Sequence, residues 1–168
     1  MSIKGLMGVL LLLFVVNGYA AGRAYKIELI VFAQHSATNE VFDQYQSQIR
    51  WPATVQPLSA YAPAGKSLAG IWSRLQASSA YRPLLHAAWI QRVGANRVGT
   101  AVRIQSAVDH IKGFFRIQRG NLLHLITDIE YRPDDVIYRI QEKRRFKLNE
   151  IHYLDHPRFG LIIRVSPR

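Results

Sequence analysis

The chain has 168 residues, no cysteine, and 22 Lys and Arg against 11 Asp and Glu, which gives a formal net charge of +11. This length suits one domain with an ordinary hydrophobic core. The lack of cysteine excludes disulfides, thiol nucleophiles and lipid attachment at a cysteine. The positive charge favours anionic partners, because it raises the rate at which they are encountered.

The first 20 residues have the pattern of a cleavable secretory signal. Lys4 precedes an apolar run over 6–16, and small residues surround a cleavage site after Ala20. The run is too short for a membrane-spanning helix, which needs about 20 apolar residues. We therefore expect a single domain over 21–168 that works outside the cytoplasm, in a bacterial periplasm.

The first half of this domain predicts one strand and two helices. Alternating and then continuous apolar residues over 25–32 indicate a strand that enters the core. Thr38 or Asn39 can cap a short helix that extends to Ile49. A proline-containing loop over 50–65 follows, and the spacing of apolar residues predicts a second helix over 67–78.

The second half predicts strands in succession, with short turns between them. Arg119-Gly120-Asn121 is typical of a hairpin turn. Closely spaced strands of this kind pair antiparallel. The expected class is α+β: an antiparallel sheet of about six strands with two helices packed on one face. The later strands are expected over 84–91, 100–108, 112–118, 122–131, 138–148 and 161–165.

The strand expected over 138–148 is strongly basic on one face. Residues of one parity share a face of a strand. The opposite face is mainly apolar, and Arg144 within it is expected to pair with an acid such as Glu150. The cationic face is either a solvated surface or a strip that binds carboxylates, which arginine does in bidentate fashion. The cationic residues are Arg139, Lys143, Arg145 and Lys147.

A polar cluster follows this strand and consists of Glu150, His152, Asp155 and His156. The last three superficially resemble a metal-ligand string, as in a metal-dependent cell-wall hydrolase. However, Pro157 favours extended geometry at His156, and residues four apart in a strand are about 13 Å apart. We therefore expect no metal or other cofactor, and interpret Asp155 and His156 as a turn in which Asp155 bonds nearby backbone N–H groups.

Other signs of catalysis are absent from the sequence. It contains neither a Gly-x-Ser-x-Gly elbow nor a glycine-rich phosphate loop. Five aromatic residues could form a sugar-stacking platform, but their spacing favours the core. They are Trp51, Trp72, Trp89, Phe114 and Phe115.

Four segments carry a resemblance to a known family. They are YKIELIVF at 25–32, YRPLLHAAWIQ at 81–91, LHL at 123–125 and RRFKLNEIHYLDHPRFG at 144–160. Together with the signal, they resemble the CsiV family of periplasmic peptidoglycan-binding proteins. The last segment is the most specific, and the resemblance covers nearly the whole of 21–168.

This resemblance implies a role without catalysis. Members of the family bind peptidoglycan and associate with LpoA, an outer-membrane lipoprotein that activates a class A penicillin-binding protein, and they thereby support cell-wall synthesis and cell shape. The resemblance assigns no binding residue. The sequence alone leaves two alternatives: the hydrolase considered above, and a general binder of anionic surfaces such as lipid headgroups.

Overall fold

The computed structural model describes residues 22–35 and 48–168. The predicted signal over 1–20 lies outside these residues, as does nearly all of the helix expected from Thr38 to Ile49. All the features reported below belong to the described residues.

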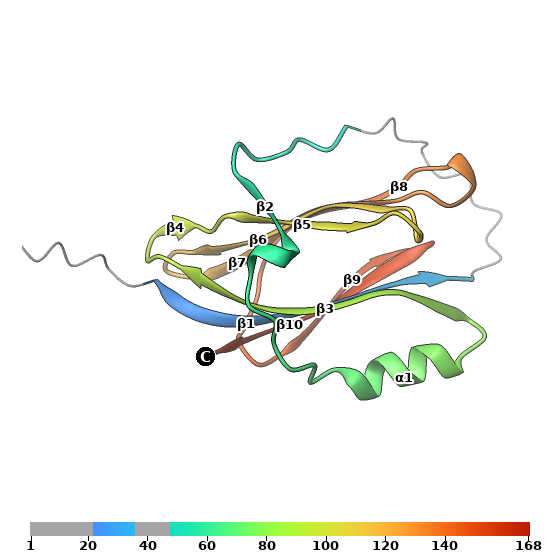
Figure 1. Ribbon diagram of the computed structural model, residues 1–168, viewed down its shortest axis with the longest axis horizontal. Coiled ribbons are helices and arrows are strands. Elements are labelled where there is room, and N and C mark those ends of the chain that lie inside the picture. The colour runs from blue at the N-terminus through green and yellow to red at the C-terminus, as the bar shows by residue number, and fades with distance from the viewer. Residues whose placement is uncertain (1–21, 36–47) are drawn as a thin grey trace, which may run out of the picture.

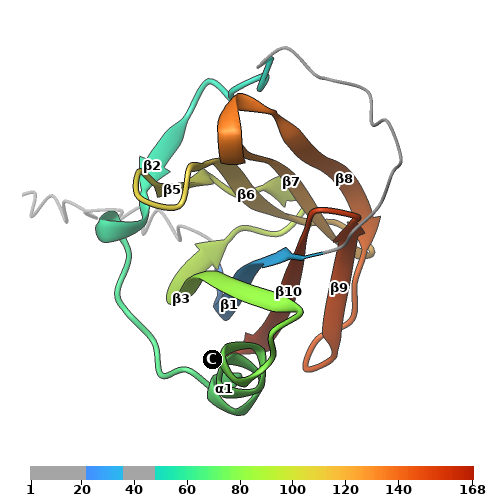
Figure 2. The same cartoon turned by 90° about the vertical axis from the view of Figure 1, so that its right-hand side faces the viewer.

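The described strands form two sheets that face each other (Figures 1 and 2). The four-stranded sheet has the order β3-β1-β10-β9, and all its pairs are antiparallel. Its strands are β3 (Tyr81–Val93), β1 (Arg23–Gln34), β10 (Phe159–Pro167) and β9 (Ile151–His156).

The six-stranded sheet has the order β2-β5-β6-β7-β8, and β4 also pairs with β6. Its pairs are antiparallel, except that β2 and β5 are parallel. Its strands are β2 (Val55–Pro57), β4 (Arg97–Val98), β5 (Ala101–Ser106), β6 (Ile111–Arg119), β7 (Leu123–Tyr131) and β8 (Tyr138–Arg145). The described chain also contains two short 3₁₀ turns, η1 (Leu58–Ala60) and η2 (Pro133–Asp135).

The core fills the space between the two sheets. Trp89 of β3 and Phe115 of β6 meet there edge to face, with ring centroids 5.8 Å apart. Both rings are almost fully buried. Side chains of alternate parity along every long strand point into this layer, as expected for a sandwich.

One α-helix, α1 (Ala69–Ala77), is present in the described chain, and it packs on the outer face of the four-stranded sheet (Figure 2). It confirms the helix expected over 67–78. Leu68 and Leu75 pack against Ile30 and Phe32 of β1. This second contact layer explains why residues 29–33 of β1 are apolar on both faces of the strand. No helix of the described residues is long and apolar enough to cross a membrane.

A buried carboxylate holds the start of α1 on the sheet. Glu28 of β1 is 1% exposed, and it accepts hydrogen bonds from the backbone N–H groups of Ser67 and Leu68, both at 2.8 Å. It also accepts bonds from Ser67 Oγ at 2.6 Å and His86 Nε2 at 2.8 Å. Burial alone would raise the pKa of Glu28, but these hydrogen bonds outweigh it, so the net effect is a lowered pKa.

The predicted fold class is wrong. The chain is mostly β, with two sheets in place of one sheet covered by two helices. The expected strands exist, but β9 was interpreted as a turn and polar cluster. Because β9 was not expected, β10 had no strand beside it in the sequence with which to pair. The pairing of β1 with both β3 and β10 joins distant parts of the chain and cannot be recognised from local pattern.

Candidate functional site

The predicted cationic strip on β8 divides into two kinds of residue. Lys143, Arg145 and Lys147 are exposed. Ile140 and Phe146, of the opposite parity, point into the core. Lys143 and Arg145 therefore face solvent on the outer side of the six-stranded sheet, as the alternation predicts. The expected strand over 138–148 ends earlier, at Arg145, so Lys147 is exposed in the connection between β8 and β9.

Arg139 belongs to the structure of the sheet. Its Nε and one terminal nitrogen each donate to a carboxylate oxygen of Asp128 at 2.6 Å. The Asp128 side chain is 2% exposed and that of Arg139 is 11% exposed. Arg139 also donates to the carbonyl of Gln48 at 3.2 Å. It thus neutralises a buried acid and is a poor candidate for contact with a ligand.

The other ion pairs of this region differ from the expected ones. Arg144 Nε lies 3.0 Å from the carboxylate of Glu142, and its guanidinium also donates to the carbonyl of Tyr153 at 3.0 Å. The expected partner, Glu150, lies 3.5 Å from Lys147 Nζ instead. Because that pair is largely exposed, it stabilises the fold little and leaves Lys147 accessible.

Strand register gathers further arginines at the end of the sandwich where β8 finishes. β1 begins and β3, β6 and β10 end there, and β4 lies at the same end (Figure 1). We define the basic end as Arg23, Arg92, Arg97, Arg119, Arg145, Lys147 and Arg168. Glu150, in the connection between β8 and β9, pairs with Lys147 of this group.

Two arginines of the basic end lie directly opposite each other. Arg97 of β4 pairs in register with Arg119 of β6. Residues opposite each other in an antiparallel pair have Cβ atoms about 5 Å apart, and like charges there are destabilising. Arg119 donates to the carbonyl of Val93 at 3.4 Å, which does not neutralise its charge. A bound anion would relieve this repulsion.

An open cavity of about 820 Å³ lies at the basic end. Arg23, Arg92 and Arg168 line it, together with Tyr61 and Ile90 and with no Asp or Glu. A second cavity of about 290 Å³ adjoins it through Ile90 and Arg168 and adds Lys26. Guanidinium groups beside a partly apolar floor suit a carboxylate carried on an organic backbone.

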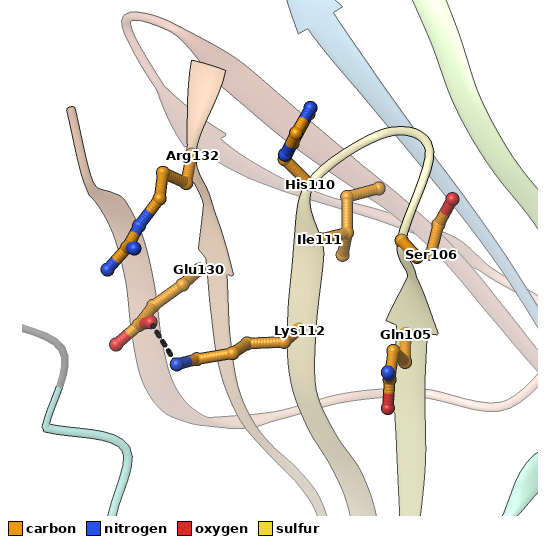
Figure 3. Close-up of a pocket in the computed structure, with 8 residues that line it drawn as sticks. Gln105, Ser106, His110, Ile111, Lys112, Glu130 and Arg132 are labelled. Atoms are coloured by element: carbon orange, nitrogen blue, oxygen red, sulfur yellow. Dashed lines mark ion pairs between the residues drawn. The ribbon is translucent and has the colours of Figure 1, made fainter. Parts of the chain in front are cut away.

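At the opposite end of the sandwich, acidic and basic side chains are mixed. Asp109 lies 3.2 Å from Arg82. A cavity of about 250 Å³ there is lined by polar residues of three neighbouring strands, and in it Lys112 Nζ lies 3.5 Å from the carboxylate of Glu130 (Figure 3). Arg132 also lines this cavity, but Glu130 supplies a negative charge that the two cavities at the basic end lack, so this cavity suits an anion less well than the basic end does.

The predicted polar cluster does not converge on one point. His152 Nε2 lies 3.0 Å from the carbonyl of Lys147. His156 Nδ1 accepts the backbone N–H of Arg158 at 3.1 Å, and burial, with Arg158, lowers the pKa of His156. Within 22–35 and 48–168, no three His, Asp or Glu side chains are placed to hold a metal ion.

Asp155 does not bond backbone N–H groups nearby in the chain, so that part of the turn interpretation is wrong. Its carboxylate accepts from Tyr153 Oη at 2.6 Å and from the side-chain amide of Gln34 at 2.8 Å. It lies in β9, on the face opposite to the two histidines, because neighbouring residues in a strand alternate.

The aromatic prediction is confirmed for Trp89 and Phe115, which are core residues. It is wrong for Trp51, which is 39% exposed and lies under the guanidinium of Arg103, 4.8 Å from the ring centroid. Phe114 is buried beneath Trp51 on the outer face of the sheet, with ring centroids 6.1 Å apart. Trp72 is half-buried and lies against His86.

The sequence reasoning missed most of the basic end. Arg23, Arg92, Arg97, Arg119 and Arg168 are scattered over the chain and become neighbours only through strand pairing. The available signal was positional, because each of these arginines lies at or next to the end of a strand.

Comparison with known proteins completes these observations. The family model of CsiV, described as a peptidoglycan-binding protein, matches residues 53–168. This match includes most of both sheets and all the basic end except Arg23. The segment at 25–32 that contributed to the resemblance lies outside it. No curated protein and no solved structure matches the chain. The family implies peptidoglycan binding and a place in the cell envelope, and the chain belongs to the CsiV family of peptidoglycan-binding proteins.

Proposed function

We propose that this protein is a periplasmic accessory factor without catalytic activity, and that it binds peptidoglycan through its basic end. The observation that carries the proposal is the concentration of arginines at one end of the sandwich, with two of them directly opposite each other. Peptidoglycan stem peptides offer free carboxylates in many copies. Arginine binds carboxylates in a bidentate manner, and many weak contacts to a polymer add up to useful affinity.

Lys143 and Arg145 extend this surface along the outer side of β8, and Lys147 extends it into the connection to β9. We therefore keep these three cations in the proposed binding surface, leave out Arg139, and add the arginines of β3 and β4. The large positive charge of the chain adds a long-range attraction to the acidic polymer.

Co-sedimentation with purified sacculi tests the proposal. The protein spanning 21–168 is expected to pellet with sacculi, and the bound fraction should fall between about 0.1 M and about 1 M salt. The Debye length shrinks from about 10 Å to about 3 Å over that range. Sacculi stripped of their stem peptides by an amidase should bind much less protein. Equal binding to stripped and intact sacculi would overturn the role of the carboxylates.

A control separates this function from general attraction to anions. Vesicles that contain anionic phospholipid present a negative surface without peptide carboxylates. Weaker binding to such vesicles than to sacculi at the same salt concentration is expected. Equal binding would favour the alternative of a general anionic-surface binder.

We extend the proposal to a partner, the lipoprotein LpoA, and through it to a class A penicillin-binding protein, cell-wall synthesis and cell shape. Family resemblance supports this step. The purified protein is expected to retain LpoA in a pull-down at physiological salt. An interaction that is absent from both the pull-down and a calorimetric titration would limit the function to wall binding.

A further inference from the structure

Three aromatic rings form a rigid surface cluster beside α1, away from the basic end. Phe32 of β1 is buried and lies between two exposed tyrosines. Tyr153 of β9 stacks on it, with ring centroids 6.1 Å apart and planes inclined by 13°. Tyr81 of β3 meets it edge to face at 5.4 Å. The two tyrosines are 45% and 38% exposed, so both present part of a ring to solvent.

A glycine allows the rings to lie flat on the sheet. Gly160 of β10 is opposite Phe32 in register. A Cβ atom at Gly160 would lie 2.6 Å from Phe32 Cζ and 2.9 Å from Tyr153 Cε2, closer than real Cβ contacts allow. The stacked arrangement therefore depends on the absence of a side chain at this position.

Polar groups fix the orientation of the exposed ring and border it. Tyr153 Oη donates to Asp155 at 2.6 Å, and the amide of Gln34 donates to Tyr153 Oη at 3.1 Å and to Asp155 at 2.8 Å. A carboxylate, an amide and a hydroxyl thus lie at the rim of an aromatic surface. Each can exchange hydrogen bonds with hydroxyl and amide groups of a ligand.

We propose that this cluster is a glycan-binding platform, on which a pyranose ring of an N-acetylated amino sugar stacks against Tyr153 and Tyr81 while Gln34 and Asp155 bond its polar substituents. A sugar ring has one apolar face and a polar rim, and the cluster has the complementary pattern. Preorganisation favours binding, because Phe32, Gly160 and the hydrogen bonds already hold Tyr153 in place. The inference rests on the proposed function, because it assigns the sugar part of the same polymer.

The position of the platform fits a ligand that spans two sites. Phe32 lies nine residues after Arg23 along β1, and a strand rises about 3.3 Å per residue. The platform and the basic end are therefore about 30 Å apart. Only a polymer can occupy both at once, with sugar rings at the platform and peptide carboxylates at the basic end.

A titration with the soluble tetramer of N-acetylglucosamine tests the platform, followed by amide chemical shifts. The tetramer carries no peptide and no carboxylate, so it does not report on the basic end. We expect shifts in β9 and at the start of β3, and an affinity about five- to tenfold weaker in Tyr153→Ala. Tyr153→Phe keeps the ring and should bind more tightly than Tyr153→Ala. Cellotetraose, which lacks acetamido groups, should bind more weakly.

Control variants distinguish a failure of the glycan-binding platform from a failure of the proposed function. Trp51→Ala removes an exposed aromatic ring that packs on the outer face of the six-stranded sheet, and it should leave tetramer binding unchanged. If the tetramer binds but Tyr153→Ala has no effect, or if it does not bind at all, the platform is wrong. The proposed function is tested separately, by co-sedimentation with intact sacculi. If Tyr153→Ala unfolds the protein, Tyr81→Ala provides the same test at the edge of the cluster.

Discussion

Arg139 and Lys143 lie on the same face of β8, but we expect only Arg139 to be needed for the stability of the fold. Replacing it with alanine leaves the Asp128 carboxylate buried, 2% exposed, without the two 2.6 Å hydrogen bonds that neutralise it. Removal of one partner from a buried ion pair costs about 3–5 kcal/mol. We therefore expect Arg139→Ala to lower the free energy of unfolding by about that amount. Lys143→Ala, on the same face but exposed, should change it by less than about 0.5 kcal/mol.

Urea unfolding followed by circular dichroism measures both values. A double variant, Arg139→Met with Asp128→Leu, removes both charges and should recover most of the lost stability, because apolar residues of similar size often replace a buried pair at little cost. A loss below about 1 kcal/mol in Arg139→Ala would refute the structural role. In that case Arg139 would return as a candidate for wall binding.

Three further predictions concern the buried carboxylate of Glu28, the packing at Gly113 and the absence of a metal requirement. Glu28→Gln should cost about 2–4 kcal/mol at pH 7, because an amide cannot accept all the hydrogen bonds that the carboxylate accepts. The folded pKa of Glu28 is depressed, so its stabilisation is complete above the unfolded value of about 4.5. This stabilisation is lost as the pH falls through the folded pKa. The difference in free energy of unfolding between wild type and Glu28→Gln, measured by urea unfolding, should therefore become smaller below pH 4.5. Gly113→Ala would place a Cβ in collision with the backbone carbonyl oxygen of Asp128, and we expect the free energy of unfolding to fall by about 3 kcal/mol or more in the same assay. Treatment with a chelator should change neither the melting temperature nor the pelleting with sacculi, and a loss of either would revive the metal hypothesis for His152 and His156.

Local pattern predicted individual elements well. The spacing of apolar residues located seven of the strands and α1, because each has a face that must be buried. It could not predict the two-sheet arrangement. β9 alternates Ile151, His152, Tyr153 and Leu154, and its polar residues obscured an edge strand whose outer face is exposed. Sheet assignment depends on which distant strands pair, and local periodicity does not contain that information.

The candidate site was predicted only in part, for the same reason. Alternation along one strand correctly placed Lys143 and Arg145 on a solvent face, whereas Lys147 is exposed in the connection after the strand ends. It could not reveal that Arg139 shares that face with a buried Asp128 from the neighbouring strand. The rings of the aromatic platform lie on β1, β3 and β9, so no stretch of sequence shows them together.

Charge removal at the basic end tests the central claim most directly. The triple variant Arg92→Gln, Arg97→Gln, Arg145→Gln loses three exposed cations from that end, and a matched control loses three exposed cations elsewhere, Lys66→Gln, Arg74→Gln, Arg132→Gln. The two variants have the same net charge and should unfold at similar urea concentrations. In sacculus co-sedimentation at physiological salt, we expect the control to pellet nearly as wild type does and the basic-end variant to remain mostly in the supernatant. Equal pelleting of the two variants would contradict the assignment of wall binding to the basic end.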